Sequence, residues 1–237
     1  MNLFYHPNIT KTDTQIVFDK EESRHIGKVL RKQSGDTLYT TNGLGYIFKV
    51  RLESVTPKKC ISSILNTEKK EMLPYKLHLA VAPTKLNDRY EWFLEKAAEI
   101  GVTEITPIIC DHSERKLIKA ERYEKILQSA MKQSLKAYLP ILNKAVSFSE
   151  FIESQQNFNG LQCIAHCEET KKQSLKKLIQ PKNDILICIG PEGDFSATEI
   201  TKAIASGFQA VSLGTSRLRT ETAAVVACHS VAFVNEV

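Results

Sequence analysis

Short segments that alternate apolar with polar residues fill the first seventy positions. They read QIVFD, TLYTTN, YIFKVRLESV and KCISSIL, with a turn-like Gly43–Gly45 before the third. Runs of this length that are rich in β-branched and aromatic residues are typical of β-strands. One helical stretch, residues 21–31, interrupts them. We therefore expect residues 1–70 to form a small β-barrel.

The pattern changes after the polar segment Asn66–Lys76, which we interpret as a linker. Beyond it, the apolar runs KLHLAVAP, EITPIIC, LQCIAHC, DILICIG and AVSLG alternate with amphipathic segments. Residues 88–101 and 119–136 carry apolar side chains at helical spacing. Strands that alternate with helices indicate an α/β fold with a mainly parallel sheet. We expect this second domain to span residues 71–237.

Two glycine-containing loops follow strands near the C-terminus. DILICIG continues into a Pro-Glu-Gly turn and then a helix, for which Ser196 is the expected N-cap, Glu199 its partner and Gly207 the stop. AVSLG continues into TSRLRTET. Because α/β proteins bind ligands at the carboxyl ends of their strands, these loops predict a ligand site. In the alternative interpretation the glycines only form tight turns. Neither a P-loop nor a GxGxxG fingerprint is present.

Charge separates the two parts of the chain. Residues 1–70 hold 12 of the 32 basic residues and 7 of the 27 acidic residues, so the whole net charge of +5 lies there. Such an excess favours a polyanionic partner, although a solvated surface would look the same. No apolar run is long enough to span a membrane, and the N-terminus lacks the features of a signal peptide. We expect a cytoplasmic protein with no membrane contact.

The six cysteines do not indicate a disulfide framework. The tightest group, Cys163-Ile-Ala-His166-Cys167, lacks a second ligand pair at zinc-binding spacing. We expect no metal.

Several motifs together resemble one known family. GPEGDFSATEI and LGTSRLRTETAA are similar to segments of the RsmE family of SPOUT-class methyltransferases. The resemblance extends to the RH…VLR stretch at residues 24–31, the KxxDRxEW segment at 85–92, the SER triplet at 113–115 and the QS pair at 133–134. It implies a PUA-like barrel, then a SPOUT α/β domain with a deep trefoil knot. It also implies a homodimer that uses S-adenosylmethionine to methylate N3 of a specific uridine in 16S ribosomal RNA of the 30S subunit.

The resemblance also implies which residues bind the cofactor. By motif match these are Ile189, Gly190, Pro191, Glu192, Gly193, Leu213, Gly214, Leu218, Arg219 and Thr220. The chain departs from the usual family pattern at three positions. Asp194 stands where glycine is usual, Arg217 falls one place later than the family arginine, and Lys136 stands where arginine is common.

Methylation at uracil N3 requires loss of the N3 proton and stabilisation of the resulting anion. We expect Arg219 and Glu221 to be catalytic, while a salt bridge to Arg217 or Arg219 is the alternative role for Glu221. The expected RNA-binding residues are Arg24, Lys28, Arg31, Lys85, Arg89, Arg115, Lys136 and Arg217. Two other functions fit less well: a SPOUT methyltransferase that acts on another RNA, and a non-catalytic RNA-binding or ribosome-assembly protein.

Overall fold

The computed structural model describes residues 2–169 and 171–236. The chain folds into two compact units, Met1–Met72 with Gln128–Leu139, and Leu73–Leu127 with Pro140–Val237. The last six residues of helix α3 (Ala120–Gln133), from Gln128 onward, therefore belong with the first unit.

The first unit is built on a five-stranded sheet. In sheet order its strands are β1 (Leu3–Tyr5), β3 (Thr37–Thr41), β4 (Tyr46–Val55), β5 (Cys60–Lys69) and β2 (Gln15–Phe18). β1 and β3 are parallel, and the other neighbours are antiparallel. Apolar side chains that alternate along these strands form a core that includes Phe4, Phe18, Phe48 and Leu52. The four strands expected from the sequence are confirmed. β5 also contains Asn66–Lys69, so the first part of the expected linker is strand.

The helical segment of the first unit differs from the expected helix over residues 21–31. α-Helix α1 (Lys20–Arg24) passes into a π-helix, η1 (His25–Val29), and Arg31 has a left-handed φ of 51°. The side chain of Ile26 enters the core of the unit. The hydroxyl of Ser23 donates to the carbonyl of Phe18 (3.1 Å) and accepts the Cys60 N–H (2.8 Å), which ties the segment to β2 and β5. These interactions hold the short helix α1 and the π-helix η1 in place, whereas periodicity alone predicts one continuous helix over residues 21–31.

The second unit is an α/β sandwich around an eight-stranded sheet in which every strand pairing is parallel. In sheet order the strands are β11 (Gln173–Ser174), β13 (Gln209–Ser212), β10 (Leu161–Ala165), β12 (Ile185–Ile189), β6 (Leu77–Val81), β7 (Glu104–Ile109) and β8 (Ile141–Leu142), with β9 (Val146–Ser147) also on β7. β6 and β12 are buried along their whole length, as expected for central parallel strands.

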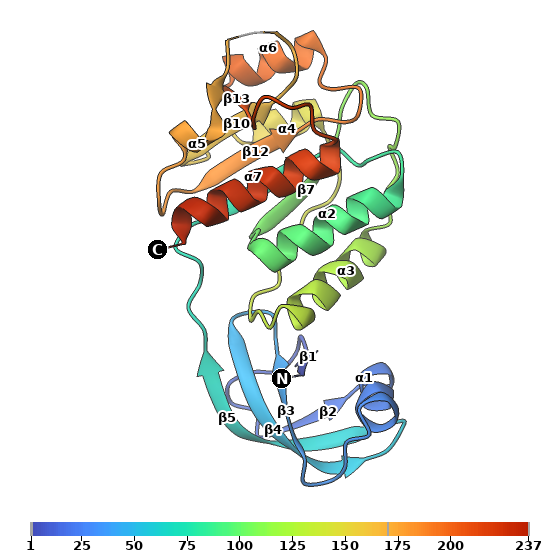
Figure 1. The fold of residues 1–237 in the computed structure, drawn as a ribbon. Coiled ribbons are helices and arrows are strands. Elements are labelled where there is room, and N and C mark those ends of the chain that lie inside the picture. Colours follow the sequence, from blue (N-terminus) through green and yellow to red (C-terminus); the bar gives the residue numbers. More distant parts are fainter. Residues whose placement is uncertain (1, 170, 237) are drawn as a thin grey trace. The chain divides into compact units, whose positions relative to one another are not determined.

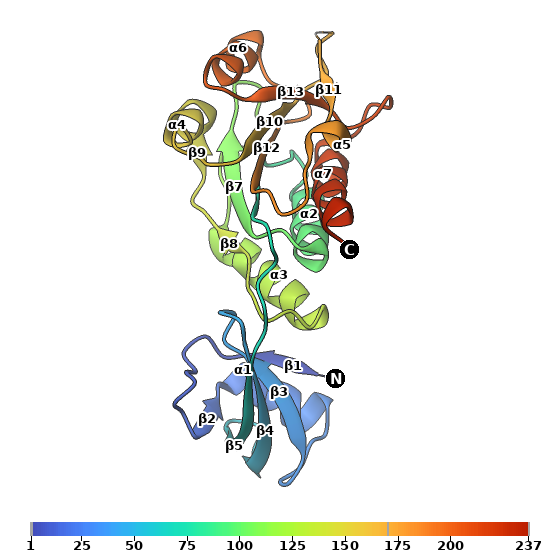
Figure 2. The ribbon, with the colours of Figure 1, turned by 90° about the vertical axis from the view of Figure 1, so that its left-hand side faces the viewer.

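Helices cover both faces of this sheet. Besides α3, they are α2 (Asn87–Ile100), α4 (Phe148–Ser154), α5 (Leu175–Leu178), α6 (Ala197–Ala205) and α7 (Thr220–Asn235). α2 and α7 lie side by side on one face, and α4 and α6 lie on the other (Figure 1, Figure 2). Helix α6 begins with the expected capping box of Ser196 and Glu199, and Gly207 after it has a positive φ of 95°. The alternation of strands and helices predicted from the sequence is confirmed; the trefoil knot stays a prediction.

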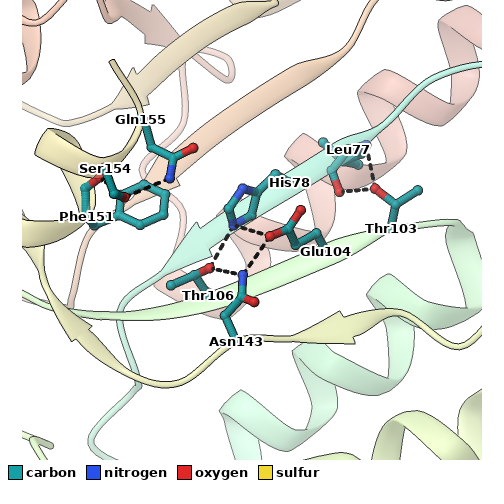
Figure 3. A network of polar contacts seen from close by, with 9 residues as sticks. All are labelled: Leu77, His78, Thr103, Glu104, Thr106, Asn143, Phe151, Ser154 and Gln155. Carbon is teal, nitrogen blue, oxygen red and sulfur yellow. Dashed lines mark hydrogen bonds and ion pairs between the residues drawn. The ribbon is translucent and has the colours of Figure 1, made fainter. Parts of the chain in front are cut away.

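A buried polar network joins β6 to β7 near the starts of these strands (Figure 3). Nε2 of His78 lies 2.7 Å from Oγ1 of Thr106 and 3.8 Å from Oε1 of Glu104. The side-chain amide of Asn143 donates to both of these oxygens, at 2.8 and 2.7 Å. Burial lowers the pKa of His78, although Glu104 acts in the opposite direction. This network lies at the amino ends of the strands, whereas ligands bind parallel sheets at the carboxyl ends.

Candidate cofactor site

Two adjoining cavities open at the carboxyl ends of β10, β12 and β13. Their volumes are about 300 and 430 Å³, in the range of small-molecule sites. Both cavities are lined by Ala165, Cys167, Asp194, Arg217, Leu218 and Ala223. The two glycine-containing loops thus meet at one place, and these cavities are the candidate for the ligand site that the sequence pattern predicts.

The loop after β12 forms the wall of the first cavity with residues 189–192. Gly190 leaves little room for a side chain there, because a Cβ would lie 3.0 Å from the ring of Phe195 and 3.2 Å from its backbone nitrogen. The hydroxyl of Thr220 donates to the carbonyl of Gly190 (3.0 Å). This hydrogen bond fixes the start of α7 against the end of β12.

The loop after β13 forms the wall of the second cavity with residues 211–218. Gly214 has a φ of 146°, which glycine adopts without strain. The hydroxyl of Ser212 donates to the carbonyl of Gly214 (2.8 Å) and accepts its N–H (3.3 Å). The chain therefore turns sharply before it presents Arg217 and Leu218 to the cavities.

Asp194, one of the departures from the family pattern, lies on the wall shared by both cavities. Its φ of 63° is left-handed, the conformation that favours the glycine usual at this position. Its carboxylate accepts the Cys167 N–H (2.6 Å) and the Phe195 N–H (2.9 Å). These bonds compensate the backbone strain, join the end of β10 to the loop after β12, and give the site a negative charge.

Every cofactor-binding residue predicted from the sequence except Gly193 lines one of the two cavities. Gly193 is exposed and faces His112, whose Nδ1 donates to the Gly193 carbonyl (3.0 Å). The carboxylate of Glu192 accepts the backbone N–H of Lys85 (2.9 Å). The loop after β12 is thereby held to the loop after β6.

The two expected catalytic residues have different surroundings. Arg219 is exposed and lines the first cavity. Glu221 is buried and does not line either cavity. Its Oε1 lies 3.8 Å from Nε of Arg89, so the ion pair anticipated for Glu221 forms with an arginine of α2 rather than with Arg217 or Arg219. Among the described residues, its Oε2 has no hydrogen-bond partner.

The expected RNA-binding residues of the second unit lie near the cavities or brace their loops. Arg217 is exposed on the wall of both cavities. Arg115 donates to the carbonyls of Thr84 (3.0 Å) and Lys85 (2.8 Å) and so fixes the loop after β6. The ammonium of Lys85 lies 2.8 Å from Glu114, which raises the pKa of Lys85.

The expected RNA-binding residues of the first unit do not share one helix face. Arg24 and Lys28 are exposed on α1 and η1, whereas Arg31 is exposed beyond the end of η1. A third cavity of about 320 Å³ lies beside them and is lined by Lys28 and Lys32. Lys136, the remaining one, follows α3 within the first unit and is half-buried.

Sequence reasoning did not assign several residues that line the cavities. They are Ala165, His166, Cys167, Lys172, Asp194, Val211, Ser212, Thr215, Ser216 and Ala223. LQCIAHC was itself a predicted strand, but only the strand order of the sheet shows that its carboxyl end lies beside those of β12 and β13. In the described ranges, no group of three or more His, Cys, Asp or Glu side chains is placed to hold a metal ion. Nor is any helix of these ranges long and apolar enough to cross a membrane.

Comparison with known proteins places both parts of the chain among RNA-modifying enzymes. The RNA methyltransferase domain family matches residues 71–232, and the RNA methyltransferase PUA domain family matches residues 18–65. The fold and its cavities are thus those of an RNA methyltransferase with a PUA domain.

Individual relatives narrow this class. Ribosomal RNA small subunit methyltransferase E of Buchnera aphidicola subsp. Acyrthosiphon pisum is 34% identical over 90% of this chain and 86% of its own length. A probable rRNA-methyltransferase from Porphyromonas gingivalis has a TM-score of 0.91 at 40% identity, covering 99% of this chain and 98% of that one. The Neisseria gonorrhoeae ribosomal RNA small subunit methyltransferase E, solved bound to S-adenosyl methionine, has a TM-score of 0.86 at 26% identity, with coverages of 99% and 98%. The chain belongs to the ribosomal RNA small subunit methyltransferase E family, which confirms the resemblance found in the sequence.

Proposed function

We propose that the protein transfers a methyl group from S-adenosylmethionine to N3 of a specific uridine in 16S ribosomal RNA of the 30S subunit, giving 3-methyluridine. The observation that carries the proposal is the meeting of the two glycine-containing loops around adjoining cavities, tied by the hydrogen bond from Thr220 to Gly190. Two relatives that share this fold and 26–40% of the sequence are named as rRNA methyltransferases, and one of them binds S-adenosyl methionine.

The residues present fit S-adenosylmethionine. The cavities combine apolar walls with exposed backbone of the glycine loops, which suits a nucleoside. Asp194 supplies a negative charge for a cationic ligand, and buried His166 has ring nitrogens without a hydrogen-bond partner in the described chain. When bound, the cofactor supplies an electrophilic methyl group on a sulfonium. The chain's part is to orient that group and to exclude water from it.

Arg219 is the proposed catalytic residue for the target base. Its guanidinium is exposed at the first cavity and can stabilise the anion that uracil forms when N3 loses its proton. Arg217, two residues earlier in the same loop, is proposed to hold a phosphate of the RNA. Glu221 is the second proposed catalytic residue. It lines neither cavity, and its buried Oε2, which has no partner in the described ranges, is the atom proposed to assist proton removal. The pairing with Arg89 keeps this carboxylate in place at the start of α7.

We further propose that residues 1–70 bind the RNA and that residues 71–237 catalyse the methyl transfer. Arg24, Lys28, Arg31 and Lys136 would contact phosphates from the first unit, and Lys85, Arg89 and Arg115 would act from the second. Phosphate contacts of this kind are lost as salt rises, so binding to 30S subunits should weaken steeply with ionic strength. This function would place the protein in the cytoplasm.

A homodimer is part of the proposal. Trp92 on α2 is 43% exposed and Phe233 on α7 is 67% exposed, although both are large apolar side chains. These two helices pack against each other in the second unit (Figure 1). Apolar side chains left at the surface of adjacent helices support a second copy as the partner. Light scattering of the purified chain tests this proposal, and a monomeric mass would contradict it.

The decisive experiment uses 30S subunits from cells that lack this protein. The subunits are incubated with the purified chain and methyl-labelled S-adenosylmethionine, and the 16S RNA is digested to nucleosides for mass spectrometry. We expect label in 3-methyluridine. An Arg219→Gln variant should lose most of the transfer. Arg122→Gln is the control, because Arg122 lines neither cavity and pairs with Glu91 at the surface.

The other outcomes separate the alternatives. Label in a different nucleoside, or only in another RNA, would show that the protein is a methyltransferase with a substrate other than the proposed uridine. Cofactor binding without any transfer to ribosomal RNA would also move the substrate elsewhere. Failure of the wild-type chain to bind S-adenosylmethionine at all would support the non-catalytic RNA-binding protein.

A further inference from the structure

His166 is a buried polar side chain that the chain itself leaves unpaired. It follows β10 directly and lies on the wall of the second cavity. Its residue is only 7% exposed, and neither Nδ1 nor Nε2 has a hydrogen-bond partner within residues 2–169 and 171–236. Because burying an unpaired polar group is costly, such groups in native proteins are commonly met by a ligand or by water.

The charged groups around His166 are already engaged elsewhere. Lys172 donates from Nζ to the backbone carbonyls of His166 (3.0 Å) and Glu168 (2.7 Å). Asp194 accepts the N–H groups of Cys167 and Phe195. These bonds fix the backbone on both sides of the ring, and neither group forms a hydrogen bond with a ring nitrogen of His166.

The imidazole is uncharged at neutral pH. Burial lowers the pKa of His166 and the nearby Lys172 ammonium lowers it further, while Asp194 and Glu168 act in the opposite direction. A neutral imidazole offers one N–H donor and one acceptor nitrogen. That pair matches the hydroxyls and ring nitrogens of a nucleoside, whereas the ammonium and carboxylate of an amino acid are better matched by charged groups.

The second cavity has both apolar and charged lining. Val211, Leu213, Leu218 and Ala223 give it an apolar wall, and its charged lining residues are Lys172, Asp194 and Arg217. A flat, uncharged ring with a polar edge suits the apolar wall. We propose that His166 hydrogen-bonds the nucleoside part of the cofactor through one ring nitrogen and so positions the cofactor in the site. This inference rests on the proposed function, since it takes S-adenosylmethionine as the cofactor.

The test measures affinities rather than turnover. Dissociation constants are determined by calorimetry for S-adenosylmethionine, S-adenosylhomocysteine and adenosine. His166→Phe keeps a ring and removes both nitrogens, so it should weaken all three ligands about tenfold, the effect of one hydrogen bond. Asn places an amide near the position of Nδ1 and Gln near that of Nε2, so one of His166→Asn and His166→Gln should restore most of the affinity. His229→Gln is the matched control, because His229 is exposed on α7 and lines neither cavity.

A pH series gives a second readout that a merely structural histidine would not move. Protonation removes the acceptor nitrogen and adds positive charge beside a cationic sulfonium. Wild-type affinity for S-adenosylmethionine should therefore fall as the pH drops through the lowered pKa of His166, which lies below the ordinary histidine value of about 6.5. In the rescuing amide variant this fall should be absent. The charged groups Lys172, Asp194, Glu168 and Arg217 remain in both proteins, so they do not account for the difference.

The outcomes are distinct. Unchanged affinity of His166→Phe for all three ligands would overturn the inference and leave the proposed function intact. Weakening for S-adenosylmethionine and S-adenosylhomocysteine but not adenosine would assign His166 to the methionine part, and would also overturn it. If His166→Phe does not fold, the affinities of His166→Asn and His166→Gln decide. If both variants bind the three ligands with the same affinity as the wild-type chain, a specific contact to one ring nitrogen is contradicted. Absence of cofactor binding by the wild-type chain would instead remove the proposed function itself.

Discussion

Replacing Arg89 by methionine removes the positive charge that faces the buried carboxylate of Glu221 while keeping most of the side-chain length. Nε of Arg89 lies 3.8 Å from Oε1 of Glu221, and the two side chains are 33% and 8% exposed. At this distance two unit charges attract by about 4 kcal/mol at an effective dielectric constant of about 20 and by about 1 kcal/mol in water. Because the arginine is partly hydrated, we expect a coupling free energy of about 2 kcal/mol.

A double-mutant cycle measures this value. Urea unfolding is followed for the wild-type chain, Arg89→Met, Glu221→Gln and the double variant. Trp92 is the single tryptophan and lies on α2, so its fluorescence reports the second unit. Arg89→Met should cost the most, because it leaves a buried carboxylate without its cation, and the second substitution should recover part of that loss.

An exposed ion pair of the second unit provides the matched control. Nζ of Lys202 lies 2.7 Å from Oε1 of Glu153, and the two side chains are 34% and 62% exposed, so the corresponding cycle should give less than about 1 kcal/mol. Equal coupling in the two cycles, or a value below about 0.5 kcal/mol for Arg89 and Glu221, would refute the argument that burial sets the strength of this pair.

Three further outcomes follow from other parts of the structure. Cys167 is the one exposed cysteine of the six, all of which the structure describes, and it lines both cavities. S-adenosylmethionine at ten times its dissociation constant should therefore slow the alkylation of Cys167 about tenfold, as measured by peptide mass spectrometry. An unchanged alkylation rate would place the ligand elsewhere. Burial lowers the pKa of His78, so the free energy of unfolding is unaffected by the titration of this histidine above about pH 6.5 and decreases as the pH falls from there toward the folded-state pKa. In urea titrations over this pH range, His78→Gln should reduce the slope of the unfolding free energy against pH by up to about 1.4 kcal/mol per pH unit. A slope identical to that of the wild-type chain would contradict this expectation. Gly45 has a φ of 96°, and a Cβ there would collide with the ring of Tyr138, so Gly45→Ala should destabilise the first unit by about 3 kcal/mol. That variant should lose affinity for 30S subunits in sedimentation assays and still bind S-adenosylmethionine; retained affinity for the subunits would argue against RNA binding by the first unit.

Local pattern was sufficient for the regular elements and for the two loops of the site. Short, mostly apolar runs predicted β6, β7, β10, β12 and β13. The runs are most continuous in β6 and β12, because a central parallel strand is buried on both faces. The N-cap of α6 was predicted at Ser196, because a capping box depends only on two residues three positions apart, here Ser196 and Glu199. Glycines after two successive strands indicated that ligand and backbone approach each other closely.

Short elements could not be predicted in the same way. β8, β9 and β11 contain two residues each, too few for any periodicity, and they exist because β7 and β13 offer unpaired edges. The π-helix η1 likewise has no local signature in the chain. It is stabilised by the burial of Ile26 in a core that includes residues of β3, β4 and β5, and by the hydrogen bond that Ser23 of the preceding helix α1 accepts from Cys60 of β5.

The sequence by itself determined the class of fold, the family and the two loops that line the cavities. Only the tertiary structure decided that His166 and Cys167 join those loops, since β10 reaches the site by lying between β12 and β13 in the sheet. It also decided the partner of Glu221, because α2 and α7 pack side by side and bring Arg89 to it. Periodicity records which faces are buried, but the identity of the neighbour depends on strand order and helix packing, which the whole chain fixes together.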